Sequence, residues 1–180
     1  PGMVAPTDIS AVTDFGVMQD QWQGWLIFPT GPNGASATYQ DLNPSASSTN
    51  QKSFALGGVN ADLISRSGVA AVISKSEKKV IFLNLKPLFD KVNNTYFEGS
   101  FDSLKSTLAN TGLGDSQWPP VFAVDNYAPT IIKTIHLAEK PTAVKVSLLA
   151  NPGQAWVATQ DGIIHAFSVA GVQSGLNFDP

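Results

Sequence analysis

The chain has 180 residues and a formal net charge of −3, and its low content of basic residues, 11 Lys and Arg, argues against nucleic-acid binding. It has no cysteine, which excludes disulfides, thiolate nucleophiles and cysteine-ligated metals. Charged residues make up 14% of the chain, below the roughly 25% of typical soluble domains, and no apolar run is long enough to span a bilayer, so we expect an extracellular, cell-surface or periplasmic protein without membrane insertion.

The first predicted repeat covers residues 6–57. It opens with an alternating segment at 6–12, Pro-Thr-Asp-Ile-Ser-Ala-Val, which is typical of a half-buried strand. A second apolar strand is predicted at 24–28, and a third at 37–42. The polar segment between them, 30–34, contains Asn33-Gly34, a dipeptide that favours a hairpin turn because both residues tolerate positive φ.

The second predicted repeat covers residues 59–137, with an insertion at 90–128. Its strands are expected at 59–65, 68–73, 79–85 and 130–137, and the third follows a polar turn at Lys75–Lys78. Within the insertion the apolar spacing of residues 101–109 predicts a short helix, capped by Ser100 or Asp102. A further strand is predicted at 121–124.

The third predicted repeat covers residues 141–172. Strands are expected at 141–147, 153–158 and 163–169. The last two flank Gln160-Asp161-Gly162, and Asp-Gly between two apolar runs is a strong hairpin signal. The order of strand, turn, strand, turn and strand thus recurs three times along the chain.

The spacing of three glycines that open the second strand of each repeat favours a β-propeller. Gly24, Gly68 and Gly153 lie roughly 44 and 85 residues apart, and a propeller blade takes about 40–45 residues. We therefore predict an all-β fold, a partial β-propeller of about three antiparallel blades with one mixed loop and short-helix insertion. The alternative is a β-sandwich, which also gives short alternating strands separated by turns.

Residues 130–169 resemble the YVTN-type repeat of seven-bladed propellers, in the lactonase-like and WD40-like superfamily. The stretch 155–162, Ala-Trp-Val-Ala-Thr-Gln-Asp-Gly, stands where that family has its Tyr-Val-Thr-Asn sequence, with Trp156 in place of the Tyr. The resemblance implies a fold and no particular reaction. Because three blades cannot close a ring, the rest of the ring would come from remaining blades of the same propeller or from another chain.

No catalytic constellation is visible in the sequence. His136 and His165 are the only histidines, and neither stands in a metal-binding motif. There is no Gly-x-Ser-x-Gly elbow, no phosphate-binding glycine loop and no calcium-binding EF-hand loop. We predict no catalytic residue, no metal and no cofactor, and interpret the chain as a protein without enzymatic activity.

Binding residues are expected in irregular segments, where exposed aromatic side chains can hold a protein or stack on a sugar. The candidates are Trp22 and Trp118, and Asp125 and Asn126, which could contribute to a loop site. Asn93-Asn94-Thr95 is a glycosylation sequon at Asn93, on what we predict to be a polar loop.

The leading hypothesis for function is a non-enzymatic propeller module that presents loops to a protein partner or a glycan, or that forms part of a larger surface or extracytoplasmic assembly. One alternative is a fragment of a propeller enzyme, either a lactonase-like hydrolase or a quinoprotein-type dehydrogenase. A second alternative is a self-assembling structural subunit.

Overall fold

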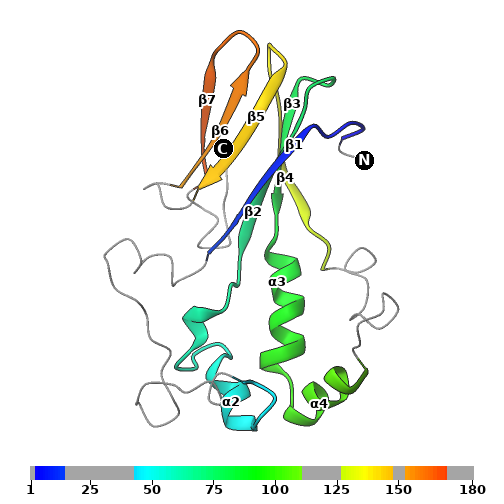
Figure 1. Ribbon diagram of the computed structural model, residues 1–180, viewed down its shortest axis with the longest axis vertical. Coiled ribbons are helices and arrows are strands. Elements are labelled where there is room, and N and C mark those ends of the chain that lie inside the picture. Colours follow the sequence, from blue (N-terminus) through cyan, green and yellow to red (C-terminus); the bar gives the residue numbers. More distant parts are fainter. Residues whose placement is uncertain (1–2, 15–42, 111–126, 148–152, 170–180) are drawn as a thin grey trace. The chain divides into compact units, whose positions relative to one another are not determined.

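The computed structural model describes residues 3–14, 43–110, 127–147 and 153–169 (Figure 1). The chain divides into two compact units, and each is built from segments that are distant in sequence. The sheet unit comprises Pro1–Asp14, Ser67–Pro87 and Pro129–Pro180, and the insertion unit comprises Phe15–Arg66 and Leu88–Ala128.

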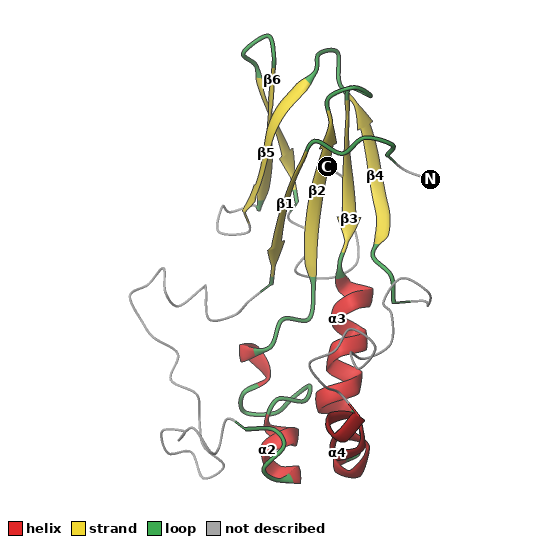
Figure 2. Cartoon of the chain, turned by 45° about the vertical axis from the view of Figure 1, so that its right-hand side comes forward, coloured by secondary structure: helices red, strands yellow, loops and turns green. Residues whose placement is uncertain are grey.

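The first sheet of the sheet unit has four strands, seen side by side in Figure 2. They are β1 (Asp8–Thr13), β2 (Gly68–Ser74), β3 (Lys79–Asn84) and β4 (Thr130–His136), paired in that order and all antiparallel. The central strand β2, Gly-Val-Ala-Ala-Val-Ile-Ser, is almost entirely buried, in keeping with its nearly continuous apolar sequence.

The second sheet has three strands, β5 (Pro141–Ser147), β6 (Gln154–Thr159) and β7 (Ile164–Ser168), again antiparallel and in chain order. The predicted Asp-Gly hairpin joins β6 to β7. Gly162 adopts a positive φ of 84°, and Asp161 Oδ1 accepts a hydrogen bond of 2.6 Å from the Thr159 hydroxyl. The turn sequence therefore sets the register of this hairpin locally.

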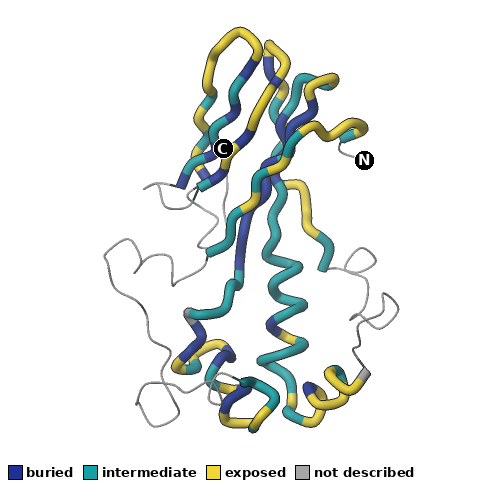
Figure 3. Tube along the Cα trace, in the orientation of Figure 1, coloured by how far each residue is buried: buried dark blue, intermediate teal, exposed yellow. Residues whose placement is uncertain are grey.

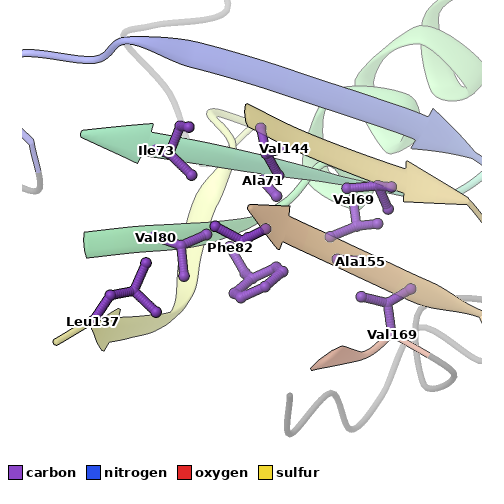
Figure 4. Close-up of a cluster of buried hydrophobic side chains, with 11 residues drawn as sticks. Val69, Ala71, Ile73, Val80, Phe82, Leu137, Val144, Ala155 and Val169 are labelled. Atoms are coloured by element: carbon purple, nitrogen blue, oxygen red, sulfur yellow. The ribbon is translucent and has the colours of Figure 1, made fainter. Parts of the chain in front are cut away.

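The two sheets share one hydrophobic core, drawn in Figure 4. Because side chains alternate along a strand, Val69, Ala71 and Ile73 of β2 lie on one face of the first sheet. The second sheet contributes buried side chains from β5 and β6, among them Val144 and Val157. The sheets thus pack on each other through one shared core of aliphatic and aromatic side chains.

β1 and β5, the first strands of the two sheets, run side by side and parallel. The backbone N–H of Val144 donates to Asp8 Oδ2 at 3.1 Å, and the N–H of Val146 donates to Ser10 Oγ at 3.0 Å. The donors and acceptors advance together along both strands, which shows the parallel direction. Side chains of β1 thereby satisfy edge N–H groups of β5 that no strand pairs.

The insertion unit carries short helical elements: α2 (Ser48–Ser53), a 3-10 helix (Ala61–Leu63), most of α3 (Lys86–Asn93), a π-helical segment (Asn94–Glu98) and α4 (Phe101–Asn110). Side-chain caps define two of the starts. Ser47 Oγ accepts from the N–H of Asn50, and Ser100 Oγ accepts from the N–H of Ser103, each at 3.1 Å. The second of these confirms the helix predicted at 101–109 and its cap.

Burial in the insertion unit is less continuous than in the sheets (Figure 3). Leu104 of α4 is fully buried, whereas its neighbours Ser103 and Lys105 are exposed, so α4 packs through one narrow face. Several of the buried side chains in this unit are polar, including Asn50, Gln51, Asn60 and Asn93.

Of the predicted all-β propeller, the coarser part is confirmed: the described residues are mostly β, with two antiparallel sheets and few helices. The division into three repeats stays a prediction, because the strands predicted at 24–28 and 37–42 lie outside the described residues. The strand predicted at 6–12 pairs with Gly68–Ser74, so the repeats at 6–57 and 59–137 contribute to one sheet. The predicted boundary between these two repeats, at residues 57–59, lies in the connection between the paired strands β1 and β2.

Two local predictions are wrong. Residues 59–65 form no strand: the N–H of Asn60 donates to the Ser53 carbonyl at 2.8 Å, which folds this segment back on α2. The polar loop predicted around Asn93 is instead helical, because helix α3 extends from Lys86 to Asn93. The strands predicted at 24–28, 37–42 and 121–124 lie outside the described residues.

Candidate functional site

The two long connections of the sheet unit begin at the same end of the strands, which we call the insertion end. β1 and β2 are joined by residues 14–67, and β3 and β4 by residues 85–129. Because neighbouring strands are antiparallel, both connections start from the same end of the first sheet. β5 runs parallel to β1, so the connection 148–153 lies at that end too.

The opposite end, here called the turn end, is closed by short connections. Four residues, 75–78, join β2 to β3, and Lys78 adopts a positive φ of 49° there. Residues 137–140 join β4 to β5, and residues 160–163 join β6 to β7. The sheet unit therefore has its long connections at one end and its tight turns at the other, as rigid scaffolds that carry binding loops do.

The four predicted binding residues fall in the two long insertions. Trp22 belongs to the sequence between β1 and β2, and Trp118, Asp125 and Asn126 belong to the sequence between β3 and β4. All four lie outside the described residues. Whether their side chains converge stays a prediction, but the topology starts both of their segments at the insertion end.

Asn93, the predicted glycosylation site, lies at the end of α3 and not on a loop. It is 4% exposed, and its Nδ2 donates to the carbonyls of Phe89 and Ser65 at 2.8 and 3.0 Å. A carbohydrate on this nitrogen would displace both hydrogen bonds. The folded environment of Asn93 therefore disfavours the modification that its sequon predicts.

The sequence contains a signal for the start of α3, the helix that ends at Asn93. The Asn84 side chain accepts from the N–H of Lys86 at 2.9 Å, and Pro87 follows in the first turn. An Asn followed closely by a Pro before an amphipathic stretch is typical of a helix start, because Pro lacks the N–H that the first turn leaves without a partner.

Polar side chains tie the segments of the insertion unit together. Glu98 Oε1 accepts from the N–H of Leu56 at 2.7 Å and from Arg66 Nη1 at 3.3 Å. Lys52 Nζ donates to the carbonyls of Glu98 and Gly99 at 3.0 and 3.1 Å. These contacts join residues 52–66 to the end of the π-helical segment, which indicates a structural role for Glu98.

Gln51 forms the buried part of the same contact region. It is fully buried, and its Nε2 donates to the carbonyls of Tyr96 and Gly99 at 3.2 and 3.4 Å. The insertion unit is thus held together in part by hydrogen bonds from side chains of α2 to backbone carbonyls near the end of the π-helical segment. Such polar networks fix one arrangement of short helices that have little apolar surface to bury.

Two carboxylates at the turn end have lowered pKa values. The Lys79 ammonium, 2.6 Å from Glu77 Oε1, and the N–H of Val4, 2.9 Å from Glu77 Oε2, lower the pKa of Glu77 to about 2. The hydroxyl of Thr159 lowers the pKa of Asp161. Both groups are ionised at neutral pH and hold turns, so neither is suited to donate a proton in catalysis.

The two histidines do not form a metal site with other described residues. His165 of β7 stacks on Phe167 with ring centroids 6.4 Å apart, while His136 of β4 is exposed. Across the described residues, no cluster of three or more His, Asp or Glu side chains could hold a metal ion. His165 is therefore interpreted as a packing residue of β7.

Comparisons with protein-family models, curated proteins and solved structures find no match for this chain. Among the described residues, no helix is both long enough and apolar enough to cross a membrane. The function must therefore be inferred from the geometry of the sheets and of the connections between their strands.

Proposed function

We propose that the chain is a portion of a β-propeller that acts as a non-enzymatic binding platform and presents its partner site at the insertion end. The observation that carries the proposal is the route from β4 to β5. β4 lies at one edge of the first sheet, yet the next strand, β5, lies beside β1 and β2. Only residues 137–140 make this crossing.

This route suits radial repetition. In a propeller, each blade is an antiparallel meander, and the chain passes from its last strand to the first strand of the next blade. First strands of neighbouring blades then run parallel. The hydrogen bonds from Val144 and Val146 to the side chains of Asp8 and Ser10 support this relation between β5 and β1.

The sequence repeat supports the same relation. Register pairs Ala71 with Ser10 and with Phe82, and it pairs Trp156 with Lys145 and with Ala166. Aligning Ala71 with Trp156 also aligns Gly-Val-Ala-Ala-Val-Ile-Ser of β2 with Gly-Gln-Ala-Trp-Val-Ala-Thr at 153–159. This alignment supports the proposal that the three strands of the second sheet repeat β1, β2 and β3 of the first sheet, as the resemblance of 130–169 to the YVTN-type repeat implies.

The insertion end is the proposed binding end. Both long insertions leave the strands at this end, and their sequences contain all four predicted binding residues. A rigid base lets loops hold a fixed shape at low entropic cost, which favours binding. The partner is a protein or a glycan at the surface or outside the cytoplasm.

Site-specific photo-cross-linking tests this proposal. A photoreactive residue is placed at Val59, 63% exposed in the insertion unit, or at Ile163, 51% exposed at the turn end. Each full-length chain is then mixed with the surface and extracellular fraction of its own source. We expect one defined adduct from position 59 and none from position 163, and Trp118→Ala should reduce the adduct.

Adducts from position 163 alone, or from neither position, would contradict the proposed binding end. The same holds for an adduct from position 59 that is unchanged in both Trp118→Ala and Trp22→Ala.

A further inference from the structure

Each sheet has a second face that points away from the shared core. On the first sheet it is the Ile9 face, formed by Ile9 and Ala11 of β1, Ala70 and Val72 of β2, and Ile81 and Leu83 of β3. On the second sheet it is the Trp156 face, formed by Ala143 and Lys145 of β5, Trp156 and Ala158 of β6, and Ile164 and Ala166 of β7. Both sets follow from alternation along paired strands.

The Trp156 face is exposed or partly exposed and is apolar apart from Lys145, whereas the Ile9 face is exposed only along β1, because Ala70 and Ile81 are 2% and 3% exposed. Ile9 is 62% exposed, and Ile164 is 68% exposed. Trp156 is only partly buried, whereas Val157, its neighbour in β6, is fully buried in the core. An apolar sheet face of this kind commonly marks an interaction surface.

The internal repeat identifies what each outer face matches. Under the alignment that pairs Ala71 with Trp156, the Trp156 face corresponds to the core-facing side of the first sheet. The Ile9 face likewise corresponds to the core-facing side of the second sheet, where Val144 and Val157 lie. The two outer faces therefore repeat the two inner faces that already pack on each other within one chain.

We infer that a second copy of the chain docks head to tail, with the exposed β1 side of the Ile9 face of one copy on the Trp156 face of the other. The inference rests on the propeller-like packing in the proposed function, because it extends that packing from one chain to the next. Such an interface is heterologous: each copy keeps one unused face, so association continues until a ring closes or a filament forms.

One difference from the internal interface makes the association between copies weaker than packing within the chain. Asp8 and Ser10 accept hydrogen bonds from β5, but the matching positions on the Trp156 face are Ala143 and Lys145. A docked copy gains the apolar contact without these two hydrogen bonds. We therefore expect reversible assembly that depends on protein concentration.

Complementation of two variants tests the head-to-tail arrangement. Ile9→Lys disables one face, and Ile164→Lys disables the other. Sedimentation velocity of the full chain should show a sedimentation coefficient that rises with concentration. Each variant alone should associate at least about tenfold more weakly, since burial of one isoleucine is worth that much or more. An equal mixture of the variants should form dimers and nothing larger, because each supplies the intact face that the other lacks.

Val59→Lys is the matched control, since it adds the same charge at an exposed apolar residue of the insertion unit, and it should assemble as the unchanged chain does. Three results would overturn the inference: an unchanged chain that is monomeric at every concentration, a variant mixture that stays monomeric, or an Ile164→Lys variant that assembles normally. A monomeric chain that still forms its adduct from position 59 would remove self-association alone and leave the binding platform intact.

Discussion

Replacement of Phe82 by alanine tests the packing of the two sheets more directly than any other single change. Phe82 lies on β3 of the first sheet and is fully buried. Its ring meets that of Phe167, on β7 of the second sheet, edge to face with centroids 5.6 Å apart. The pair therefore bridges the two sheets through one aromatic contact.

The expected magnitude follows from burial and ring geometry. Phe82→Ala should lower the free energy of unfolding by about 4 kcal/mol, within the range of Phe-to-Ala changes in packed cores. Phe167→Ala should cost about 2 kcal/mol, because Phe167 is only partly buried against the core. Since an edge-to-face pair is worth about 1 kcal/mol beyond burial, the double variant should lose about 5 kcal/mol, less than the two losses together.

Urea unfolding followed by circular dichroism measures the three losses, and the double-mutant cycle isolates the coupling. A Leu104→Ala variant serves as a comparison, because Leu104 is fully buried in the insertion unit and should not couple to Phe167. If Phe82→Ala costs less than about 1 kcal/mol, or if the coupling to Phe167 is absent, the shared core described for the two sheets is incorrect.

Three further predictions concern single sites. In Glu77→Gln, thermal melts at pH 7 should show lower stability. The difference in stability between Glu77→Gln and the unchanged chain should narrow as pH falls from about 4.5 to about 2, because protonation of Glu77 then removes its stabilising interactions from the unchanged chain as well. A difference that stays constant over this range would contradict the prediction. Asp8→Ala should cost about 1–3 kcal/mol in urea unfolding, since the N–H of Val144 loses its acceptor, whereas Asp8→Asn should recover most of the loss. Gly58→Ala should disrupt the insertion unit, because a Cβ there would collide with carbonyl oxygens of α2. Gly162→Ala has open space around it and should cost only about 1 kcal/mol of backbone strain. Equal losses of protection against hydrogen exchange in the two variants would refute the distinction.

The strands that could be predicted are those specified by their own residues. Val69–Ile73 and Lys79–Asn84 are apolar runs around a polar turn, and the strands around Asp161-Gly162 have a hairpin signal at their centre. Helix α4 likewise has its cap, Ser100, directly before it. In each case the determinants lie within a few residues of one another, so one sequence window contains the whole cause.

Strand pairing across an insertion could not be predicted in the same way. The partner of β1 is β2, and residues 14–67 separate them. Nothing local to β1 favours Gly68–Ser74 over a nearer strand; the choice depends on Val12 packing against the shared core and on Asp8 meeting β5. The strand predicted at 59–65 is wrong for the opposite reason: its local sequence favours a strand, but hydrogen bonds to α2 fold the segment differently.

The described strands are devoted to packing, whereas all four predicted binding residues lie in the sequences that connect strands. The strands are occupied with packing: their inner faces fill the core, and Asp8 and Ser10 serve as acceptors for a neighbouring edge. Insertions at the insertion end leave this packing intact, since the entropy of closing a longer loop grows only with the logarithm of its length. Chemistry that selects a partner can therefore vary in 14–67 and 85–129 while the sheets stay fixed. Exchange of residues 75–78, at the turn end, should accordingly change stability and leave partner recognition unaltered.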